Sequence, residues 1–127
     1  MLRFVFDCET NGLLHELNTV HSLVLRDIDD GDVTSCADQK DYEPIVNGLY
    51  MLSKADLLVG HNIINFDFRA LKKVYKSFKL KKNCKIYDTL IVSRVLSPEL
   101  EPVDEAKFSH IPPKYKGKHS LGVFFFF

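Results

Sequence analysis

A short hydrophobic segment near the start of the chain ends in two acids. Residues 2–6 are aliphatic, β-branched or aromatic apart from Arg3, a pattern that predicts a buried central strand. Asp7 and Glu9 follow two residues apart, so on a strand their side chains point to the same side. Two unpaired carboxylates at a buried strand end repel each other and are costly to desolvate, and a divalent cation removes that conflict. The alternative is an ordinary exposed pair of acids.

The rest of the pattern predicts an α/β fold. Strands are predicted at 2–6, 20–28, 33–36 and 57–59, and helices from Asp41 to 55, from Asn65 or Asp67 to Phe78, and from Asp88 to 96. An Asp-Gly turn joins the second and third strands, which favours an antiparallel hairpin at the start of the sheet. This order predicts a mixed sheet with helices on both faces.

Length and composition exclude several classes of protein. A chain of 127 residues forms one ordinary domain, and 46% hydrophobic with 27% charged residues is too apolar for a disordered chain. No apolar run reaches the roughly 18 residues of a membrane-spanning helix, and the first residues lack the sections of a signal peptide. The chain is therefore predicted to be cytoplasmic. Its cysteines, odd in number and widely spaced, are interpreted as reduced: Cys8, Cys36 and Cys84.

The formal net charge of zero hides a strong asymmetry. Residues 1–70 carry five Lys and Arg against twelve Asp and Glu, whereas residues 71–127 carry twelve against five. Seven lysines fall between Lys72 and Lys85. Such a block either solvates an exposed helix or faces a polyanion.

A second cluster of polar residues follows the predicted strand at 57–59. It runs from His61 to Asp67 and leads into the lysine-rich helix, so Asp67 is a third acid near the end of a strand. Asp67 has an alternative role as an acid stabilised by the dipole at a helix N-terminus. Asn62 is equally compatible with a plain turn residue.

Together these segments resemble the first two motifs of the DEDD-type 3′–5′ exonucleases. Residues 7–14 look like the first motif of the proofreading domain in family A DNA polymerases, and His61, Asn62, Phe66 and Asp67 look like the second. Asn62 and Asp67 are separated by four residues, a spacing similar to that in polymerases of short-tailed phages. Residues 88–94 and 118–121 extend the resemblance, which implies an RNase H-like fold for a single domain over 1–127.

The resemblance also implies roles for individual residues. Asp7, Glu9 and Asp67 would hold two Mg²⁺ or Mn²⁺ ions, which activate water and stabilise the leaving 3′ oxygen. Asp88 would be a structural acid that caps a helix. The positions implied to bind the terminal nucleotide are Thr10, Leu13 as an apolar wedge, Asn62 and Phe66.

The fourth acid of this family belongs to a third motif, Tyr-x3-Asp, which the 127 residues do not contain. Tyr115 and His119 have its spacing, but His replaces Asp and the pair lies in a long polar loop predicted at 98–118. We therefore expect little exonuclease activity unless a complementing fragment supplies the acid. The Phe-rich end at 122–127 is interpreted as a reading frame that stopped early in a homopolymeric run, or else as a tail buried under the sheet or in a dimer contact through Phe124–Phe127.

The leading functional hypothesis is an impaired exonuclease domain acting on single-stranded DNA 3′ ends, in the host cytoplasm if the chain is phage-encoded. The lysine block then contacts the nucleic acid, a polymerase domain or solvent. One alternative is a non-catalytic remnant or split-protein fragment that binds nucleic acid or a polymerase partner. Another is an α/β interaction domain whose acids are ordinary turn and cap residues.

Overall fold

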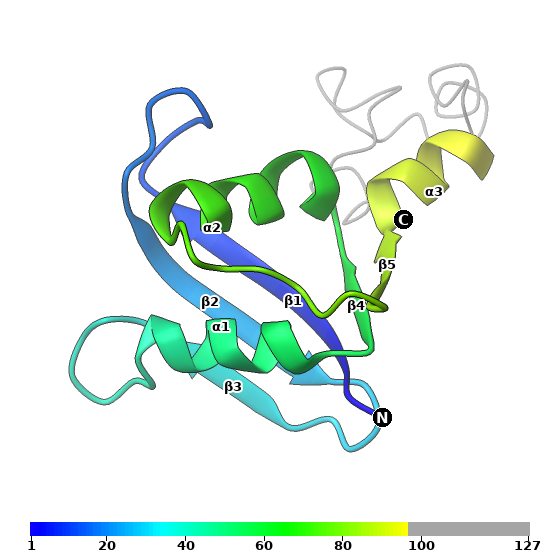
Figure 1. The fold of residues 1–127 in the computed structure, drawn as a ribbon, viewed down its shortest axis with the longest axis horizontal. Helices are drawn as coiled ribbons and strands as arrows, with labels where there is room; N and C mark the ends of the chain where they lie inside the picture. Colours follow the sequence, from blue (N-terminus) through cyan, green and yellow to red (C-terminus); the bar gives the residue numbers. More distant parts are fainter. Residues whose placement is uncertain (97–127) are drawn as a thin grey trace, which may run out of the picture. The chain divides into compact units, whose positions relative to one another are not determined.

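A computed structural model describes residues 1–96 of the chain (Figure 1). The chain divides into two compact units, Met1–Asp88 and Thr89–Phe127, and the described part of the second is helix α3 (Thr89–Leu96). The predicted loop at 98–118 and the Phe-rich end at 122–127 lie outside the described residues. One domain over 1–127 therefore stays a prediction.

The first unit is built on a five-stranded mixed sheet. Its order is β3-β2-β1-β4-β5, with β1 in the centre as predicted. β1 is antiparallel to β2 and parallel to β4; β2 is antiparallel to β3, and β4 is parallel to β5. The strands are β1 (Arg3–Thr10), β2 (Val20–Asp27), β3 (Val33–Cys36), β4 (Leu57–Gly60) and β5 (Lys85–Asp88). The predicted mixed sheet with an antiparallel start is confirmed.

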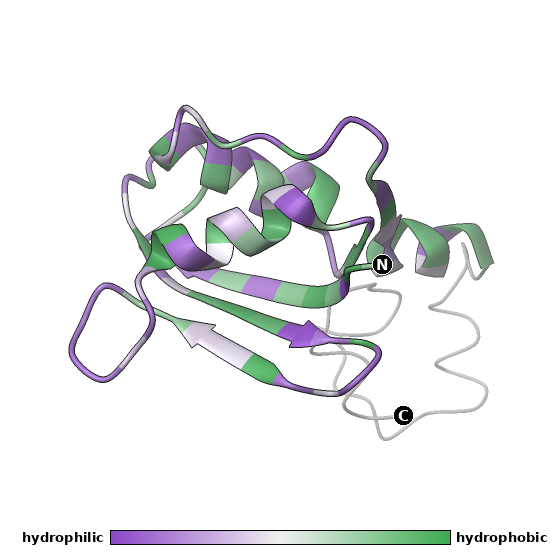
Figure 2. Cartoon of the chain, turned by 60° about the horizontal axis from the view of Figure 1, so that its bottom comes forward, coloured by the Kyte–Doolittle hydropathy of each residue, from purple (hydrophilic) through white to green (hydrophobic). Residues whose placement is uncertain are grey.

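Alternation along the strands places the hydrophobic core on one face of the sheet. In β1, Phe4, Phe6 and Cys8 are buried, whereas the residues between them are exposed. β2 follows the same rule with Leu23 and Leu25 inside. Figure 2 shows hydrophobic stretches along these strands, interrupted by hydrophilic residues. This period of two is typical of a sheet with one packed face and one open face.

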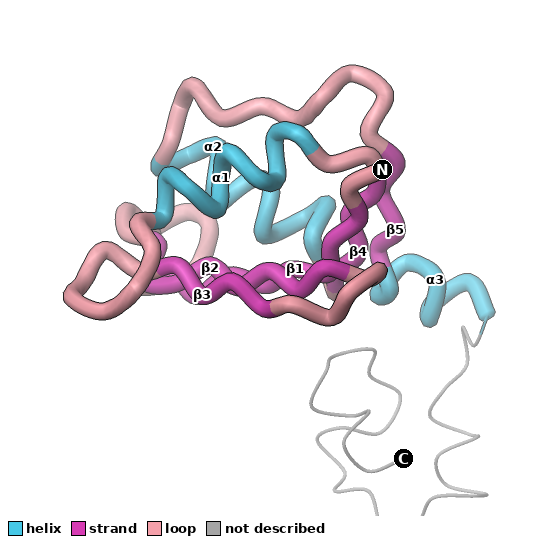
Figure 3. Tube along the Cα trace, turned by 90° about the horizontal axis from the view of Figure 1, so that it is seen from below, coloured by secondary structure: helices cyan, strands magenta, loops and turns pink. Residues whose placement is uncertain are grey.

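Two helices cover the packed face (Figure 3). Helix α1 (Ile45–Lys54) buries Ile45, Leu49 and Leu52, which recur at helical spacing. After β4 the chain forms a five-residue π-helix, η1 (Ile63–Asp67), that continues into α2 (Phe68–Val74). Within Met1–Asp88 both helices lie on this one face. The prediction of helices is therefore confirmed for one face of the sheet, and helices on the second face stay a prediction.

Several predicted boundaries are wrong. Asp41 does not cap α1, because the helix begins later and Asp38 Oδ1 accepts the N–H of Ile45 at 3.0 Å. The second helix begins earlier than predicted, as a π-helix, and α2 ends at Val74, four residues before Phe78. Strand β5 was not predicted. Within residues 1–96 no helix is long and apolar enough to cross a membrane.

Candidate active site

The first acid pair lies inside strand β1, on the open face of the sheet. β1 continues past the predicted end to Thr10, with a register shift against β2 between Glu9 and Thr10. Asp7 and Glu9 are therefore exposed on the side opposite the helices. The prediction that both carboxylates are buried and therefore costly to desolvate is wrong, because both side chains are exposed. It holds in a milder form, since partial burial and then the charge of Glu9 raise the pKa of Asp7.

Strand β4 leaves β1 just before these acids. The two strands pair only from Arg3 with Leu57 to Val5 with Val59. At Gly60 a Cβ atom would lie 2.9 Å from the carbonyl oxygen of Phe6 and would also collide with Ile63. Glycine therefore allows the chain to turn away beside β1. The turn leads directly into η1.

Asp67, at the end of η1, lies beside the stretch of β1 that β4 no longer covers. The backbone N–H of Cys8 donates to Asp67 Oδ2 at 3.1 Å. Cys8 stands between Asp7 and Glu9, so the bond places the third acid at the same point of the strand. Asp67 is 3% exposed, and burial raises its pKa to about 6; the side chain of Cys8 opposes this shift and the charge of Asp7 adds to it.

A second buried acid holds the loop that precedes η1. Asp88, at the end of β5, accepts the N–H of Asn62 on Oδ1 at 2.9 Å and the N–H of Ile64 on Oδ2 at 3.0 Å. Asn62 has φ 60°, a left-handed conformation that asparagine tolerates better than most residues. The carboxylate thus satisfies amides at the start of η1, and its role here is structural.

Two of the implied substrate-binding residues lie at the end of β1 and in the connection to β2. Thr10 Oγ1 donates to the carbonyl oxygen of Gly12 at 2.9 Å, and Leu13 is 63% exposed. From α2, Lys73 Nζ donates to the carbonyl oxygen of Leu14 at 2.7 Å. The loop is therefore tied to the second-motif helix while Leu13 stays open to solvent. Phe66, in η1, is half-buried.

These residues fit a hard divalent cation by chemistry, although they do not form a complete metal site. Carboxylate oxygens are the ligands that Mg²⁺ and Mn²⁺ prefer. Burial raises the pKa values of Asp7 and Asp67, and the charge of a neighbouring carboxylate adds to each shift. Within residues 1–96, however, no group of three or more His, Cys, Asp or Glu side chains is arranged to hold a metal ion. Tyr115 and His119 lie outside the described residues.

Three contributors to the site were missed at the level of sequence. The Cys8 amide is a backbone group, and no residue pattern announces that it holds Asp67. The hydrogen bond from Lys73 to the loop was missed because Lys73 is one of seven lysines between Lys72 and Lys85, and nothing in the sequence distinguishes it from the others. Gly60 was seen as the end of a strand, and its position directly before the second motif was the available signal for a tight turn.

Comparison with known proteins identifies the family and the fold. A profile of the RNase H superfamily matches residues 4–108. A DNA-directed DNA polymerase of Enterobacteria phage T3 is 31% identical over 131 residues, an alignment that covers 92% of this chain. The chain spans only 18% of that polymerase's length.

Solved structures share the fold at low sequence identity. An SSB/exonuclease I structure matches with a TM-score of 0.53 and 15% identity, over 80% of this chain and 31% of that one. The family B DNA polymerase of the archaeon Pyrobaculum calidifontis matches with a TM-score of 0.50 and 18% identity, over 68% of this chain and 13% of that one. The chain belongs to the RNase H superfamily, as an RNase H-like domain related in sequence to the phage T3 polymerase.

Proposed function

We propose that this chain is a metal-dependent 3′–5′ exonuclease domain that hydrolyses the terminal phosphodiester of single-stranded DNA. The observation that supports the proposal is the bond from Cys8 N–H to Asp67 Oδ2, which joins the second motif to the backbone of the residue between Asp7 and Glu9. The sequence relation to a DNA polymerase and the fold shared with exonuclease I support the same activity.

Each residue of the site has a distinct task in this proposal. Asp7, Glu9 and Asp67 hold two Mg²⁺ or Mn²⁺ ions; such ions activate the attacking water and stabilise the charge on the leaving 3′ oxygen. The Cys8 amide fixes Asp67, and Asp88 fixes the start of η1, so both limit movement of the second motif.

The terminal nucleotide is proposed to contact four residues beside the acids. Leu13 is exposed and apolar, which suits a wedge against a base, and Thr10 lies at the end of β1 next to Glu9. Asn62 and Phe66 belong to the loop and the π-helix that carry Asp67. All four lie on the two segments that bear the acids.

Three carboxylates are fewer than the four that hold the metals in this family. With one acid and the orienting tyrosine absent from these 127 residues, we propose that the chain alone hydrolyses DNA weakly. A fragment that carries a Tyr-x3-Asp helix would restore the activity.

The test follows the shortening of a 5′-labelled single-stranded oligonucleotide from its 3′ end in Mn²⁺, with and without a complementing fragment from a related phage polymerase. We expect weak cleavage alone, strong cleavage with the fragment, and loss of both in Asp7→Ala. Asp32→Ala, which removes an exposed acid of the turn between β2 and β3, is the matched control. Cleavage that persists in Asp7→Ala would refute the proposed site, and strong cleavage by the unaided chain would refute the need for a fourth acid.

A second candidate function is a non-catalytic remnant that binds nucleic acid or a polymerase partner. It is favoured by the lack, within residues 1–96, of acids already arranged around a metal position. Oligonucleotide binding that does not change with Mn²⁺, together with no cleavage in the presence of the fragment, would support it over catalysis.

A further inference from the structure

The connection between β1 and β2 is a loop that one side chain closes at its base. Asn11 Oδ1 accepts the N–H groups of Asn18 at 3.0 Å and Thr19 at 3.1 Å. The backbone N–H of Asn11 also donates to the carbonyl oxygen of Thr19 at 3.2 Å. These bonds join the two ends of the segment at 11–19, so the residues between them have little freedom to move. We call this segment the wedge loop.

A turn inside the wedge loop fixes both backbone polar groups of Leu13. The carbonyl oxygen of Leu13 accepts the N–H groups of Glu16 at 3.0 Å and Leu17 at 2.8 Å. Glu16 Oε1 accepts the N–H of Leu13 at 3.3 Å. The Leu17 side chain is buried at 1% exposure, whereas Leu13 is 63% exposed. The turn therefore anchors one leucine in the interior and presents the other to solvent.

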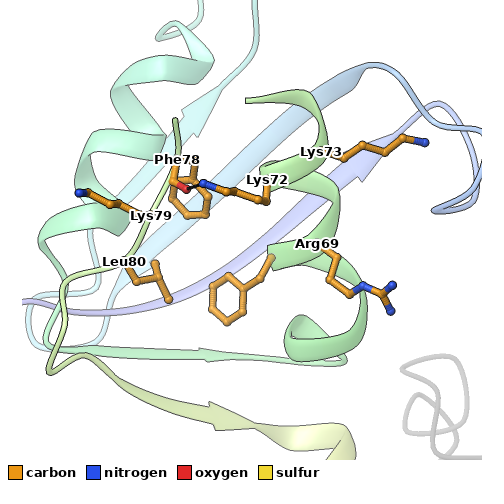
Figure 4. A pocket seen from close by; sticks show the side chains of 7 residues that line it. Arg69, Lys72, Lys73, Phe78, Lys79 and Leu80 are labelled. Carbon is orange, nitrogen blue, oxygen red and sulfur yellow. Dashed lines mark hydrogen bonds between the residues drawn. The ribbon is translucent and has the colours of Figure 1, made fainter. Parts of the chain in front are cut away.

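Lys73 joins the wedge loop to helix α2. Its Nζ donates at 2.7 Å to the carbonyl oxygen of Leu14, the residue that follows Leu13. The Lys73 side chain extends away from the pocket lined by Phe78 and Leu80, toward the blue loop between β1 and β2 (Figure 4). The ion pairs formed among residues 1–96 do not involve Lys73, so in this part of the chain no acid competes with the carbonyl for its ammonium group.

The bond from Lys73 connects the same two segments as the bond that holds the third acid. Cys8 N–H donates to Asp67 Oδ2 at 3.1 Å, and each of these bonds joins residues that are 59 positions apart. The first-motif and second-motif segments therefore keep one offset from the acids to the wedge loop. A side chain is presented in a fixed geometry only when its neighbours hold the backbone that carries it. Leu13 meets this condition through its own turn and through Lys73.

We propose that Lys73 is a positioning residue that holds Leu13 beside the 3′-terminal base of a bound single strand. Lys73 acts through the loop and not on the nucleotide: it fixes the carbonyl oxygen of Leu14, and the turn then sets where the Leu13 side chain lies. The inference rests on the proposed function, in which Leu13 is the wedge against that base. Loss of one hydrogen bond should shift the equilibrium between inserted and withdrawn wedge about fivefold.

The probe is a single-stranded oligonucleotide with 2-aminopurine as its 3′-terminal base and a phosphorothioate as its last linkage, which slows cleavage. Stacking on the neighbouring base quenches 2-aminopurine, and a wedge that separates the two bases raises its fluorescence. Titration with the full chain in Mn²⁺ should give a rise at saturation that Leu13→Ala abolishes. Lys73→Met should lower the rise to about one to two thirds of the wild-type value and weaken binding at most about threefold. Lys73→Arg, which keeps a donor on a long side chain, should restore most of the rise.

The matched control is Lys76→Met, which removes an exposed lysine just after α2 and should leave the wild-type rise unchanged. Salt dependence separates positioning from direct contact with the DNA. Each phosphate contact to a single strand contributes about −0.7 to the slope of log affinity against log salt concentration, so Lys73→Met should keep the wild-type slope. Circular dichroism checks that all variants fold.

Three results would overturn the inference while leaving cleavage at the acids intact. The first is a full rise in Lys73→Met, and the second is an equal loss in Lys73→Met and Lys73→Arg. The third is a slope that becomes shallower by about 0.7 in Lys73→Met, which would make Lys73 a phosphate contact. A rise that is absent in wild type or persists in Leu13→Ala would overturn it as well, because Leu13 would not be the wedge. Failure of the proposed function is seen separately, as cleavage that is absent in the complemented chain or unaffected by Asp7→Ala.

Discussion

Two buried carboxylates of the first unit have opposite surroundings. Within residues 1–96, Asp67 and Asp88 are the buried charged side chains, at 3% and 4% exposure. Asp88 accepts two backbone N–H groups that η1 leaves open, whereas Asp67 accepts the N–H of Cys8 and has the charge of Asp7 nearby. One acid stabilises the fold. The other is held where its charge is unfavourable, which is typical of a group kept for function.

The largest expected effect is on the acid that serves the fold. Asp88→Ala leaves the amides of Asn62 and Ile64 without their acceptor at a buried position, and should lower the free energy of unfolding by about 3 kcal/mol. Denaturant unfolding at pH 7 measures this loss. Asp88→Asn keeps one acceptor oxygen and should lose about half as much. A loss below about 1 kcal/mol for alanine would mean that the carboxylate is not needed to hold the loop.

The next effect has the opposite sign. Asp67→Asn keeps an acceptor for Cys8 N–H but removes the buried charge, so without divalent cations at pH 7.5 it should stabilise the chain, by at most about 3 kcal/mol. The pKa of Asp67 is raised to about 6, above an unfolded value of about 4. The native state therefore binds the extra proton, and the wild type loses stability as the pH rises through that window.

The measurement compares the melting temperatures of wild type and Asp67→Asn at pH 4 and pH 7.5. The advantage of the variant should be present at pH 7.5 and nearly absent at pH 4. Asp56→Asn offers a contrast, because the hydrogen bond from Lys81 lowers the pKa of Asp56 and its loss should not stabilise the chain. A variant of Asp67 that is less stable than wild type at pH 7.5 would break the contrast with Asp88.

The sequence predicts most of the sheet because its signals are local. Alternation in β1 and β2 and the Asp-Gly turn between β2 and β3 depend on neighbouring residues, and these elements are confirmed. Strand β5 was missed because Lys85, Ile86 and Tyr87 are all exposed, so no alternation marks it. Phe78 extended the predicted helix since it fits the helical stripe, but it lies in the chain after α2 and is buried in the hydrophobic core.

The residues of the candidate site could be predicted from the sequence, but the burial and the hydrogen-bond partners of their side chains could not. The spacing of Asp7, Glu9 and Asp67 was readable, and so was a structural role for Asp88. The exposure of Asp7 and Glu9 was not readable, because acids after Phe6 look like the end of a strand, whereas β1 continues on an open face. The different treatment of Asp67 and Asp88 depends on backbone amides far along the chain, which no local pattern encodes.

A divalent cation should bind at Asp67 but not at Asp88, and so stabilise the chain through only one of the two acids. Mn²⁺ at about five times its Kd should stabilise the wild type by about 1 kcal/mol, since it binds the folded acids and not the unfolded chain. The shift in melting temperature should be lost in Asp7→Asn and reduced in Asp67→Asn. It should survive in Asp88→Asn, whose carboxylate bonds backbone amides. An equal shift in all variants would place the ion elsewhere.

The smallest effect concerns the loop of the first motif. An exposed side chain, Lys73, holds this loop, whereas the buried carboxylate of Asp88 holds the loop of the second motif. Lys73→Met removes the bond to the carbonyl oxygen of Leu14 but keeps the aliphatic stem, so it should lower stability by only about 0.5 kcal/mol. Hydrogen exchange of the amides at 11–19 should nevertheless become faster, because the tether to α2 is gone. Lys76→Met, also exposed just after α2, is the control and should leave that loop unchanged. Unchanged exchange at 11–19 in Lys73→Met would show that the Asn11 side chain, which accepts the N–H groups of Asn18 and Thr19, orders the loop without help from α2.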